Sequence, residues 1–244
     1  QDETGSLVGE KVPDPPVRDR ERIKMKKYRI LYEDKDLLAV YKPAGVATQS
    51  ARPTVPDLMS MLQNEMLLRG EKIQLRLVNR LDQPVEGILL VAKNRDAAAD
   101  LSRQAADHTR MEKWYRALVC GKLPEKEGML VDYLTEDARE NRSGICPPDT
   151  PGAKECRLSY RVLEEGGGWS LVEIRLLTGR RHQIRVQMAH AGAPVMGDRK
   201  YGKADPGSRG LALCSFRLTF CHPRTGEVLS FQIDPAFPVP PTAL

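Results

Sequence analysis

The chain has 244 residues, of which 41% are hydrophobic and 29% are charged, and its formal net charge is +5. Such a chain can bury a full core and forms one large domain or two small ones. No apolar run approaches the roughly 20 residues that a membrane-spanning helix needs, and the polar N-terminal stretch has no signal-peptide pattern. We therefore expect a cytoplasmic protein without a membrane partner.

The charge balance leaves the class of partner open. An excess of 38 Lys and Arg over 33 Asp and Glu is compatible with a polyanion such as nucleic acid, and it fits an ordinary basic protein equally well. The five cysteines are odd in number and lack a regular spacing, which indicates free thiols in a reducing compartment. A monomer is the default expectation.

Residues 1–24 differ in composition from the rest of the chain. They contain three prolines and a run of charged residues, which is typical of a flexible leader or extension. Met25 is the first methionine, and a strand pattern begins soon after it. We interpret 25–244 as one folded domain, with Met25 as a candidate for the natural start.

Short apolar stretches bounded by turn residues predict strands over 28–32, 37–41, 75–78, 88–93, 113–119, 158–163, 170–177, 211–220 and 228–233. Helices are predicted from Thr54, over 97–106 and between His182 and Gly192. The polar, Pro- and Gly-containing stretch 132–154 is interpreted as a surface excursion. Because many strands follow one another without an intervening helix, the fold class is α+β with a mixed, mostly antiparallel sheet.

The first predicted helix has a defined start. Thr54 and Asp57 have the spacing of a capping box, and Pro56 falls in the first turn. The residues that repeat at helical spacing, and should form its apolar face, are Leu58, Met61, Leu62 and Met66.

A polar cluster interrupts the apolar pattern where the strand 75–78 ends. The segment Asn79-Arg80-Leu81-Asp82 follows that strand directly, and Gly87 opens the next one. Asp82 is therefore expected in a short loop between two strands, where a carboxylate can face a cleft from a rigid support. The alternative is a turn aspartate that accepts hydrogen bonds from nearby backbone amides.

A second polar cluster, Gly-Arg-Arg-His-Gln-Ile-Arg, occupies residues 179–185. Ile184, Met188 and Ala191 then repeat at helical spacing and Gly192 is a natural stop, so the cluster marks the start of a helix. A helix N-terminus favours anions, and the arginines add bidentate donors for phosphate or carboxylate. A solvated basic patch is the alternative.

Two further elements carry candidate functional residues. Alternation along the strand 113–119 places Tyr115 and Trp114 on opposite faces. An aromatic side chain on a sheet face can stack on a nucleobase, or it can belong to the core. The segment Lys42-Pro43-Ala44-Gly45 forms a tight turn, where Lys42 is either solvated or close to a site.

No metal or nucleotide cofactor is predicted. None of the four histidines takes part in an H-E-x-x-H or C-x-x-C pattern. The adjacent Cys221 and His222 would point to opposite faces of a strand. The sequence also contains neither a phosphate-binding loop nor a dinucleotide-binding fingerprint.

Five motifs follow one another along the chain: Lys42-Pro43-x-Gly45, Arg80-Leu81-Asp82 with Gly87, Lys113-x-Tyr115-x-Ala117, Gly179-Arg180-x-His182-Gln183-Ile184-Arg185 and Gly197-Asp198-x-x-Tyr201-Gly202. In this order they resemble the RluA-type pseudouridine synthases, from about Tyr28 to Pro238. The resemblance implies a catalytic domain with a central mixed, mostly antiparallel sheet, flanking helices and a catalytic cleft. It also implies an isomerase that converts uridine to pseudouridine in structured RNA, either ribosomal or transfer RNA, without a cofactor.

The resemblance implies roles for individual residues. Asp82 matches the family's catalytic aspartate, and Tyr115 matches the tyrosine that packs on the target base. Arg185 matches the arginine that pairs with the catalytic carboxylate, and Arg80 stands where the family displaces the target nucleotide. The same motifs supply further residues that we expect to bind substrate, namely Lys42, Arg180, His182 and Gln183.

Two departures from the family's pattern lie close to Asp82. Many relatives have His before Arg-Leu-Asp, where this chain has Asn79, and many have Thr-Ser where it has Val85-Glu86. Because the first predicted strand starts at Tyr28, we also expect no N-terminal S4-like RNA-binding domain in this chain.

Two other functions stay open from the residues alone. A non-catalytic RNA-binding protein could retain the same cleft. A glycoside or nucleoside hydrolase could use Asp82, but it lacks an evident second carboxylate, although Glu86 is nearby in sequence. In a synthase or in a hydrolase, an anionic carboxylate beside an arginine can attack an electron-poor sugar carbon or stabilise positive charge on it.

Overall fold

The computed structural model describes residues 28–50, 55–107, 110–202 and 210–239, so the predicted leader lies outside the described residues. The helices of this part are α2 (Leu58–Leu68), α3 (Arg95–Asp107) and α4 (Gln183–His190). Among the described residues, no helix is long and apolar enough to span a bilayer.

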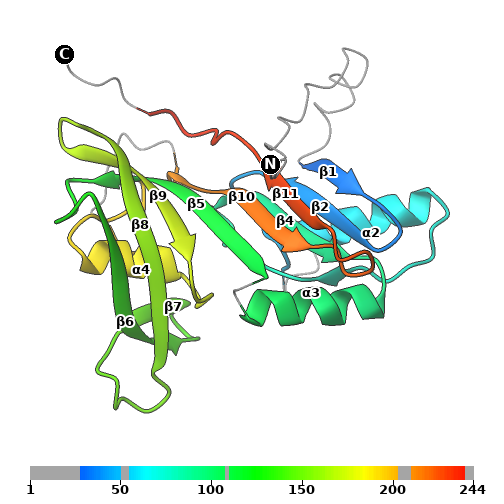
Figure 1. Cartoon of the computed structure of the whole chain (residues 1–244), viewed down its shortest axis with the longest axis horizontal. Coiled ribbons are helices and arrows are strands. Elements are labelled where there is room, and N and C mark those ends of the chain that lie inside the picture. The colour runs from blue at the N-terminus through cyan, green and yellow to red at the C-terminus, as the bar shows by residue number, and fades with distance from the viewer. Residues whose placement is uncertain (1–27, 51–54, 108–109, 203–209, 240–244) are drawn as a thin grey trace, which may run out of the picture.

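The strands are β1 (Arg29–Glu33), β2 (Leu37–Lys42), β3 (Arg76–Leu77), β4 (Glu86–Ala92), β5 (Met111–Cys120), β6 (Glu127–Asp137), β7 (Arg142–Ile145), β8 (Lys154–Gly166), β9 (Trp169–Leu176), β10 (Leu213–Cys221) and β11 (Val228–Gln232). They form one sheet in the order β1-β2-β4-β10-β5-β9-β8-β6-β7, with β3 beside β4 and β11 beside β10 (Figure 1). β4 and β10 pair in parallel, and the other paired strands of the described residues run antiparallel. The predicted α+β class with a mixed, mostly antiparallel sheet is therefore confirmed.

The helices cover both faces of the sheet. Leu62 of α2 and Ile184 of α4 belong to one core cluster, so these helices pack on the same face. Leu101 of α3 packs with Leu90 of β4 in a second cluster on the opposite face. β4 is buried at every position, as a strand covered on both faces should be.

Helix α2 begins later than its sequence pattern predicts. Its N-cap is Asp57, whose side chain accepts a hydrogen bond from Ser60 N at 2.8 Å, while Ser60 Oγ accepts one from Asp57 N at 3.1 Å. The predicted start at Thr54 is therefore wrong, because the capping box uses the next suitable residue, and Thr54 itself lies outside the described residues. The predicted apolar face is buried except for Met61, which is only partly covered.

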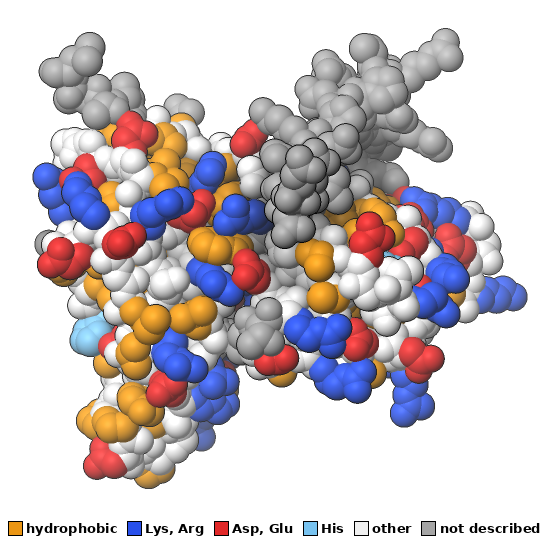
Figure 2. All heavy atoms as spheres, in the orientation of Figure 1, with side chains coloured by type: hydrophobic (Ala, Val, Ile, Leu, Met, Phe, Trp, Pro, Cys, Tyr) orange, Lys and Arg blue, Asp and Glu red, His pale blue; other side chains and the backbone are white. Residues whose placement is uncertain are grey.

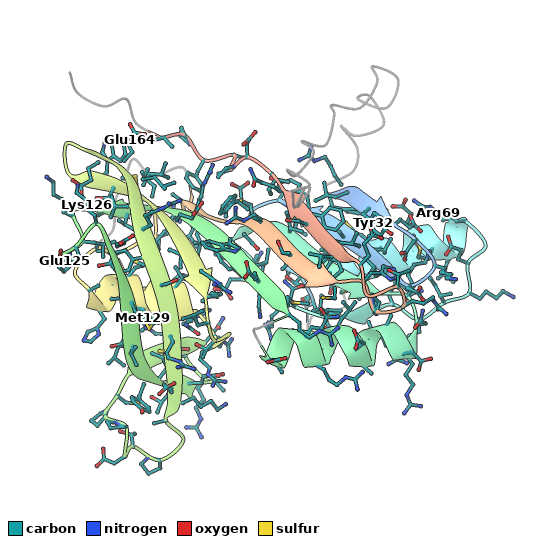
Figure 3. All side chains as sticks on the ribbon, viewed as in Figure 1. Tyr32, Arg69, Glu125, Lys126, Met129 and Glu164 are labelled. Atoms are coloured by element: carbon teal, nitrogen blue, oxygen red, sulfur yellow. The ribbon has the colours of Figure 1, made fainter. Side chains whose placement is uncertain are left out.

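The predicted surface excursion 132–154 is mostly exposed or partly buried, as expected, but its first half contains a β-hairpin that the sequence does not predict. β6 and β7 pair around a turn in which Asn141 has a φ of 50°. Exposed and partly buried residues alternate along much of β6, because one face of the strand meets solvent and tolerates polar side chains. Met129 of β6 lies at the end of the molecule opposite Tyr32 and Arg69 (Figure 3).

Candidate active site

Asp82 lies in the predicted loop between β3 and β4, and several hydrogen bonds fix that loop. Val85 N donates to Asp82 O at 3.0 Å, which closes a turn directly after the carboxylate-bearing residue. Thr48 Oγ1, which is buried, donates to Leu81 O at 2.7 Å. On the other side, Asn79 Oδ1 accepts from Leu90 N at 2.8 Å. The loop is thus held from both sides, which gives Asp82 a rigid support.

Lys42, the lysine of the first motif, also holds the Asp82 loop in place. Lys42 is fully buried, and its amine donates to the carbonyl oxygens of Pro43 at 3.1 Å, Val46 at 2.7 Å and Gln83 at 3.2 Å. Burial lowers the pKa of this amine to about 8, against the opposing charges of nearby carboxylates. Lys42 therefore lies behind the Asp82 loop and not among the residues that line the pocket. Its contact with substrate stays a prediction.

Gly87 has a packing reason for its place in the second motif. It lies opposite Ser215 in the parallel pair of β4 and β10, with a φ of 136°. A Cβ atom at this position would come within 2.5 Å of Ser215 O. Only glycine allows β10 to approach so closely beside the Asp82 loop.

Arg185, on the first turn of α4, pairs with two carboxylates. Its Nη1 lies 3.1 Å from Asp82 Oδ2, while Nε and Nη2 donate to Asp198 at 2.7 and 2.8 Å. Burial alone would lower the pKa of Arg185, but the hydrogen bonds and charges of the two aspartates raise it. Asp198 Oδ1 also accepts from the backbone amides of Lys200 at 2.9 Å and Tyr201 at 3.2 Å. Asp198 therefore orients the guanidinium that faces Asp82.

His182 completes the polar wall next to Asp82. It is the N-cap of α4, with the left-handed φ of 54°, and its Nε2 lies 3.6 Å from Asp82 Oδ2. Its Nδ1 lies 2.7 Å from the hydroxyl of Tyr201, which also accepts from Ser143 N at 2.8 Å. A Tyr201 hydroxyl that donates to Nδ1 would leave the imidazole proton on Nε2, facing Asp82. Burial and the charge of Arg185 lower the pKa of His182, against the raising effect of Asp82.

Tyr115 of β5 lies within the pocket, and only 6% of it is exposed. Burial raises the pKa of its hydroxyl, which keeps the phenol protonated. The pocket combines apolar and polar walls, lined by Arg80, Leu81, Asp82, Val85, Tyr115, Leu176, Arg180, His182, Gln183, Ile184, Arg185 and Leu213. Seven of the eight residues predicted for the site therefore lie together, and Lys42 is the exception.

Gln183 and Arg180 line the pocket and also shape it. The Gln183 side chain accepts from Arg180 N at 2.9 Å and from Thr178 Oγ1 at 2.8 Å. It donates to Arg157 O and to Gln187 Oε1, both at 3.0 Å. Gln183 is thus committed to protein contacts, whereas the Arg180 side chain is exposed at the pocket.

The sequence pattern names no role for Asp198 or Tyr201, although both belong to its last motif. The structure places them behind Arg185 and His182, and neither lines the pocket itself. The only signal in the sequence was the acidic residue of the motif that follows the helix, because an arginine that becomes buried requires a carboxylate partner.

Comparisons with known proteins identify the family. The pattern of the family described as RNA pseudouridylate synthase matches residues 36–190. The uncharacterized RNA pseudouridine synthase YlyB of Bacillus subtilis is 36% identical over 211 residues, covering 83% of this chain and 67% of that protein. Ribosomal large subunit pseudouridine synthase D of Nitrosomonas europaea is 33% identical, covering 84% of this chain and 61% of that protein. The chain thus spans about two thirds of the length of these relatives.

Two human structures share the fold. The structure titled RNA pseudouridylate synthase domain containing 1 is 27% identical with a TM-score of 0.67, covering 85% of this chain and 83% of that chain. The structure titled RNA pseudouridylate synthase domain containing 4 reaches a TM-score of 0.71 at 22% identity, covering 84% and 88%. The fold and the family predicted from the motifs are both confirmed. The chain belongs to the RNA pseudouridylate synthase family, whose members are isomerases.

Proposed function

We propose that this chain isomerises uridine to pseudouridine in RNA, with Asp82 as the catalytic residue. One observation carries the proposal. The Asp82 carboxylate faces the pocket, and its Oδ2 pairs with Arg185 at 3.1 Å, while among the described residues its Oδ1 has no hydrogen-bond partner. A carboxylate held in this way has an oxygen available to a substrate.

The reaction is a rearrangement within one nucleotide. The bond between the sugar C1′ and the base N1 breaks, a bond between C1′ and the base C5 forms, C5 loses its proton and N1 gains one. Asp82 can serve this rearrangement by attacking C1′ or by taking the C5 proton, and Arg185 and His182 stabilise its negative charge beforehand. The polar wall around Asp82 thus suits a reaction that proceeds through separated charge.

The other pocket residues receive roles from their positions. Tyr115 offers an aromatic surface beside Asp82 on which the uracil ring can pack. Arg80, which is exposed at the pocket, is placed to take the position that the target nucleotide leaves when it turns out of its stack. Arg180 supplies a second exposed cation at the pocket for the RNA backbone.

The hydrolase alternative finds no support at the pocket. A hydrolase of this type needs a second carboxylate facing the sugar. Glu86 is buried, accepts from the Tyr41 hydroxyl at 2.9 Å and from Ala236 N at 2.7 Å, and does not line the pocket. Asp198 is fully engaged behind Arg185.

The substrate class is structured RNA, either ribosomal or transfer RNA. Ribosomal RNA is the first to test, because the Nitrosomonas europaea relative and synthase C of Salmonella typhimurium, 32% identical over 92% of this chain, are both named for the large ribosomal subunit.

The test uses RNA from cells that lack the gene. Purified wild-type protein, Asp82→Asn and the matched control Asp96→Asn are each incubated with this RNA, and pseudouridines are mapped by chemical labelling and sequencing. Asp96 is an exposed carboxylate on the first turn of α3, outside the pocket, so its substitution makes the same chemical change elsewhere.

We expect new pseudouridine with the wild type and with Asp96→Asn, and none with Asp82→Asn. RNA binding without any new pseudouridine would favour the non-catalytic alternative. Release of free uracil would favour a hydrolase, and equal modification by Asp82→Asn would refute the assignment of this carboxylate.

A further inference from the structure

Three basic side chains gather where the β6–β7 hairpin meets the loops on either side of α4. Arg142 begins β7, Arg181 precedes the N-cap of α4, and Lys200 follows Asp198. We refer to Arg142, Arg181 and Lys200 as the cation cluster. None of the three belongs to the pocket lining, so the proposed chemistry leaves the cluster without a role.

The turn of the hairpin holds the three side chains together. Asn141, in its left-handed conformation, accepts from Arg181 through its side chain and from the Lys200 amine through its carbonyl oxygen. Arg142 in turn donates to the carbonyl oxygen of Lys200. Ser143 Oγ donates to Arg181 O at 2.9 Å, which ties the hairpin to the α4 loop. Uncharged carbonyl and amide oxygens therefore hold the three cations close together.

Among the residues that the structure describes, the cation cluster has no counter-ion. Within the described part of the chain, no carboxylate oxygen lies within 4.0 Å of the charged nitrogens of Arg142, Arg181 or Lys200. Burial lowers the pKa of the Lys200 amine, and the charges of Arg185, Arg142 and Arg181 lower it further, against the raising effect of Asp82. Like charges held together at a cost in free energy are typical of a site that an anion occupies.

Other basic residues of the molecule are arranged differently. On the face shown in Figure 2, Lys and Arg side chains are interspersed with Asp and Glu. Arg161 and Arg175, for example, pair with Glu173 at 3.2 Å and Glu112 at 2.7 Å. A cation cluster without a carboxylate partner among the described residues therefore differs from the pattern on this face.

The cation cluster is connected to the catalytic pocket. Arg181 is the neighbour of His182 in sequence, and the Arg142 guanidinium lies 5.3 Å from the centre of the Tyr201 ring. Tyr201 contacts His182, which faces Asp82. An anion on the cluster would thus sit at the rim of the pocket.

We propose that Arg142, Arg181 and Lys200 bind a backbone phosphate of the substrate RNA next to the target uridine. Two arginine forks and one ammonium suit phosphate oxygens in both charge and geometry. The inference rests on the proposed function for the identity of the ligand. It adds that the β6–β7 hairpin positions the RNA, so that the nucleotide enters the pocket in the correct register.

The test measures binding in the Asp82→Asn background, where turnover cannot confuse the result. A fluorescein-labelled stem-loop RNA with uridines in its loop is titrated by anisotropy at several salt concentrations. The charge-removing pair Arg142→Gln with Lys200→Gln is compared with the charge-retaining pair Arg142→Lys with Lys200→Arg. Arg103→Gln serves as the surface control, because Arg103 is exposed on α3 and pairs with Asp100.

The charge-removing pair should bind about tenfold more weakly at physiological salt. For this pair, the slope of log K against the logarithm of the salt concentration should become shallower by about 0.7 for each lost phosphate contact. The charge-retaining pair and Arg103→Gln should keep the parental slope. An unchanged affinity and slope in the charge-removing pair would overturn the inference.

A measurement on the wild-type protein covers the case in which those variants fail to fold. Lysines are acetylated with and without the RNA, and the extent at each site is read by mass spectrometry. Lys200 should be protected at least threefold by RNA, whereas Lys122, whose side chain is 67% exposed and pairs with Glu165, should react equally in both states. Equal labelling of Lys200 would refute the phosphate site. RNA binding without Lys200 protection contradicts only this inference, while absence of RNA binding contradicts the proposed function as well.

Discussion

Two regions of the described chain combine the same types of charged side chain, and one of them faces the catalytic pocket. Each has two aspartates, one arginine and one histidine within contact distance. The pocket cluster comprises Asp82, His182, Arg185 and Asp198, and the structural cluster comprises Asp34, Asp36, His222 and Arg224.

In the structural cluster, protein partners occupy every carboxylate oxygen. Asp34 Oδ1 accepts two backbone amides at 2.7 and 2.9 Å, and its Oδ2 accepts from Tyr32 at 2.9 Å and lies 2.7 Å from His222 Nε2. Asp36 receives Asn94 on Oδ1 at 2.8 Å and the Arg224 fork on both oxygens. The two aspartates and His222 lie within 4.8 Å of one another, as metal ligands do, but these hydrogen bonds already account for their oxygens.

The pocket cluster differs at one atom. Asp198 is as fully engaged as the structural aspartates, whereas Asp82 keeps Oδ1 without a partner among the described residues. Charge and burial therefore do not distinguish the two regions. An unfilled acceptor that faces a pocket does.

Asp82→Asn gives the largest effect on activity. An amide cannot attack the sugar or accept a proton, so pseudouridine formation should fall by roughly 10³-fold or more. The melting temperature should stay within about 2 °C of the wild type, because Asp198 still pairs with Arg185. Single-turnover kinetics and calorimetry on the same preparation check both statements. Substantial residual turnover would show that the unfilled oxygen of Asp82 does not mark the catalytic carboxylate.

Asp198→Asn should have the next largest effect. The loss of its charge loosens the orientation of Arg185, so kcat should fall about 10- to 100-fold. KM should change less than threefold, because Asp198 does not line the pocket. A rise in KM at constant kcat would instead make Asp198 part of the substrate-binding surface.

Asp36→Asn should affect stability and leave activity intact. Hydrogen bonds from Arg224 lower the pKa of Asp36, burial raises it, and a hydrogen bond from Asn94 lowers it further. The resulting pKa is about 2. The substitution should lower the melting temperature by roughly 4–8 °C at neutral pH. The kcat of the folded variant should match the wild type.

The direction of the Asp36 pKa shift determines how the loss of stability in Asp36→Asn depends on pH. Because the pKa of Asp36 is lower in the folded chain than the ordinary value of about 4, its stabilisation is complete above about pH 4 and is lost as pH falls through about 2. The stability difference between wild type and Asp36→Asn should therefore shrink between these values in urea unfolding. A difference that stays constant down to pH 2 would exclude this cause.

The smallest effect is the change of stability with pH in Lys42→Met, which adds to a loss of stability at every pH because three backbone carbonyls lose their donor. The folded pKa of about 8 lies below the ordinary 10.5, so between these values the unfolded chain binds more protons. Lys42 therefore makes the wild type more stable as pH rises from about 8 to 10.5, and this rise should be absent in the variant. Parallel unfolding curves for the two proteins over that range would show that burial does not perturb Lys42.

Much of the fold follows from the sequence because most strands are strongly patterned. β2, β4 and β10 are apolar and buried, so their positions are predictable within a few residues. The β6–β7 hairpin is missed because strands at the end of the sheet that expose one face to solvent carry a weak apolar pattern. The start of α2 is misplaced because Thr54 and Asp57 are both good N-caps, and only packing selects between them.

The site could be predicted as a set of motifs but not as a geometry. Motif order brings Asp82, Tyr115 and Arg185 together correctly. It does not reveal that Lys42 is buried beneath the loop, since a lysine at a strand end is usually solvated. Nor does it reveal the role of Asp198, because the pairing with Arg185 depends on how the chain returns after α4.

Loss of the hydrogen at C5 of uridine reports directly on the reaction proposed for Asp82. RNA is taken from cells that lack the gene and were grown with 5-tritiated uridine, and tritium released to water is counted after addition of protein. Wild type and Asp36→Asn should release tritium at equal rates per folded molecule, and Asp82→Asn should release none above background. Tritium release by Asp82→Asn at the wild-type rate, or no release by the wild type, would contradict the account.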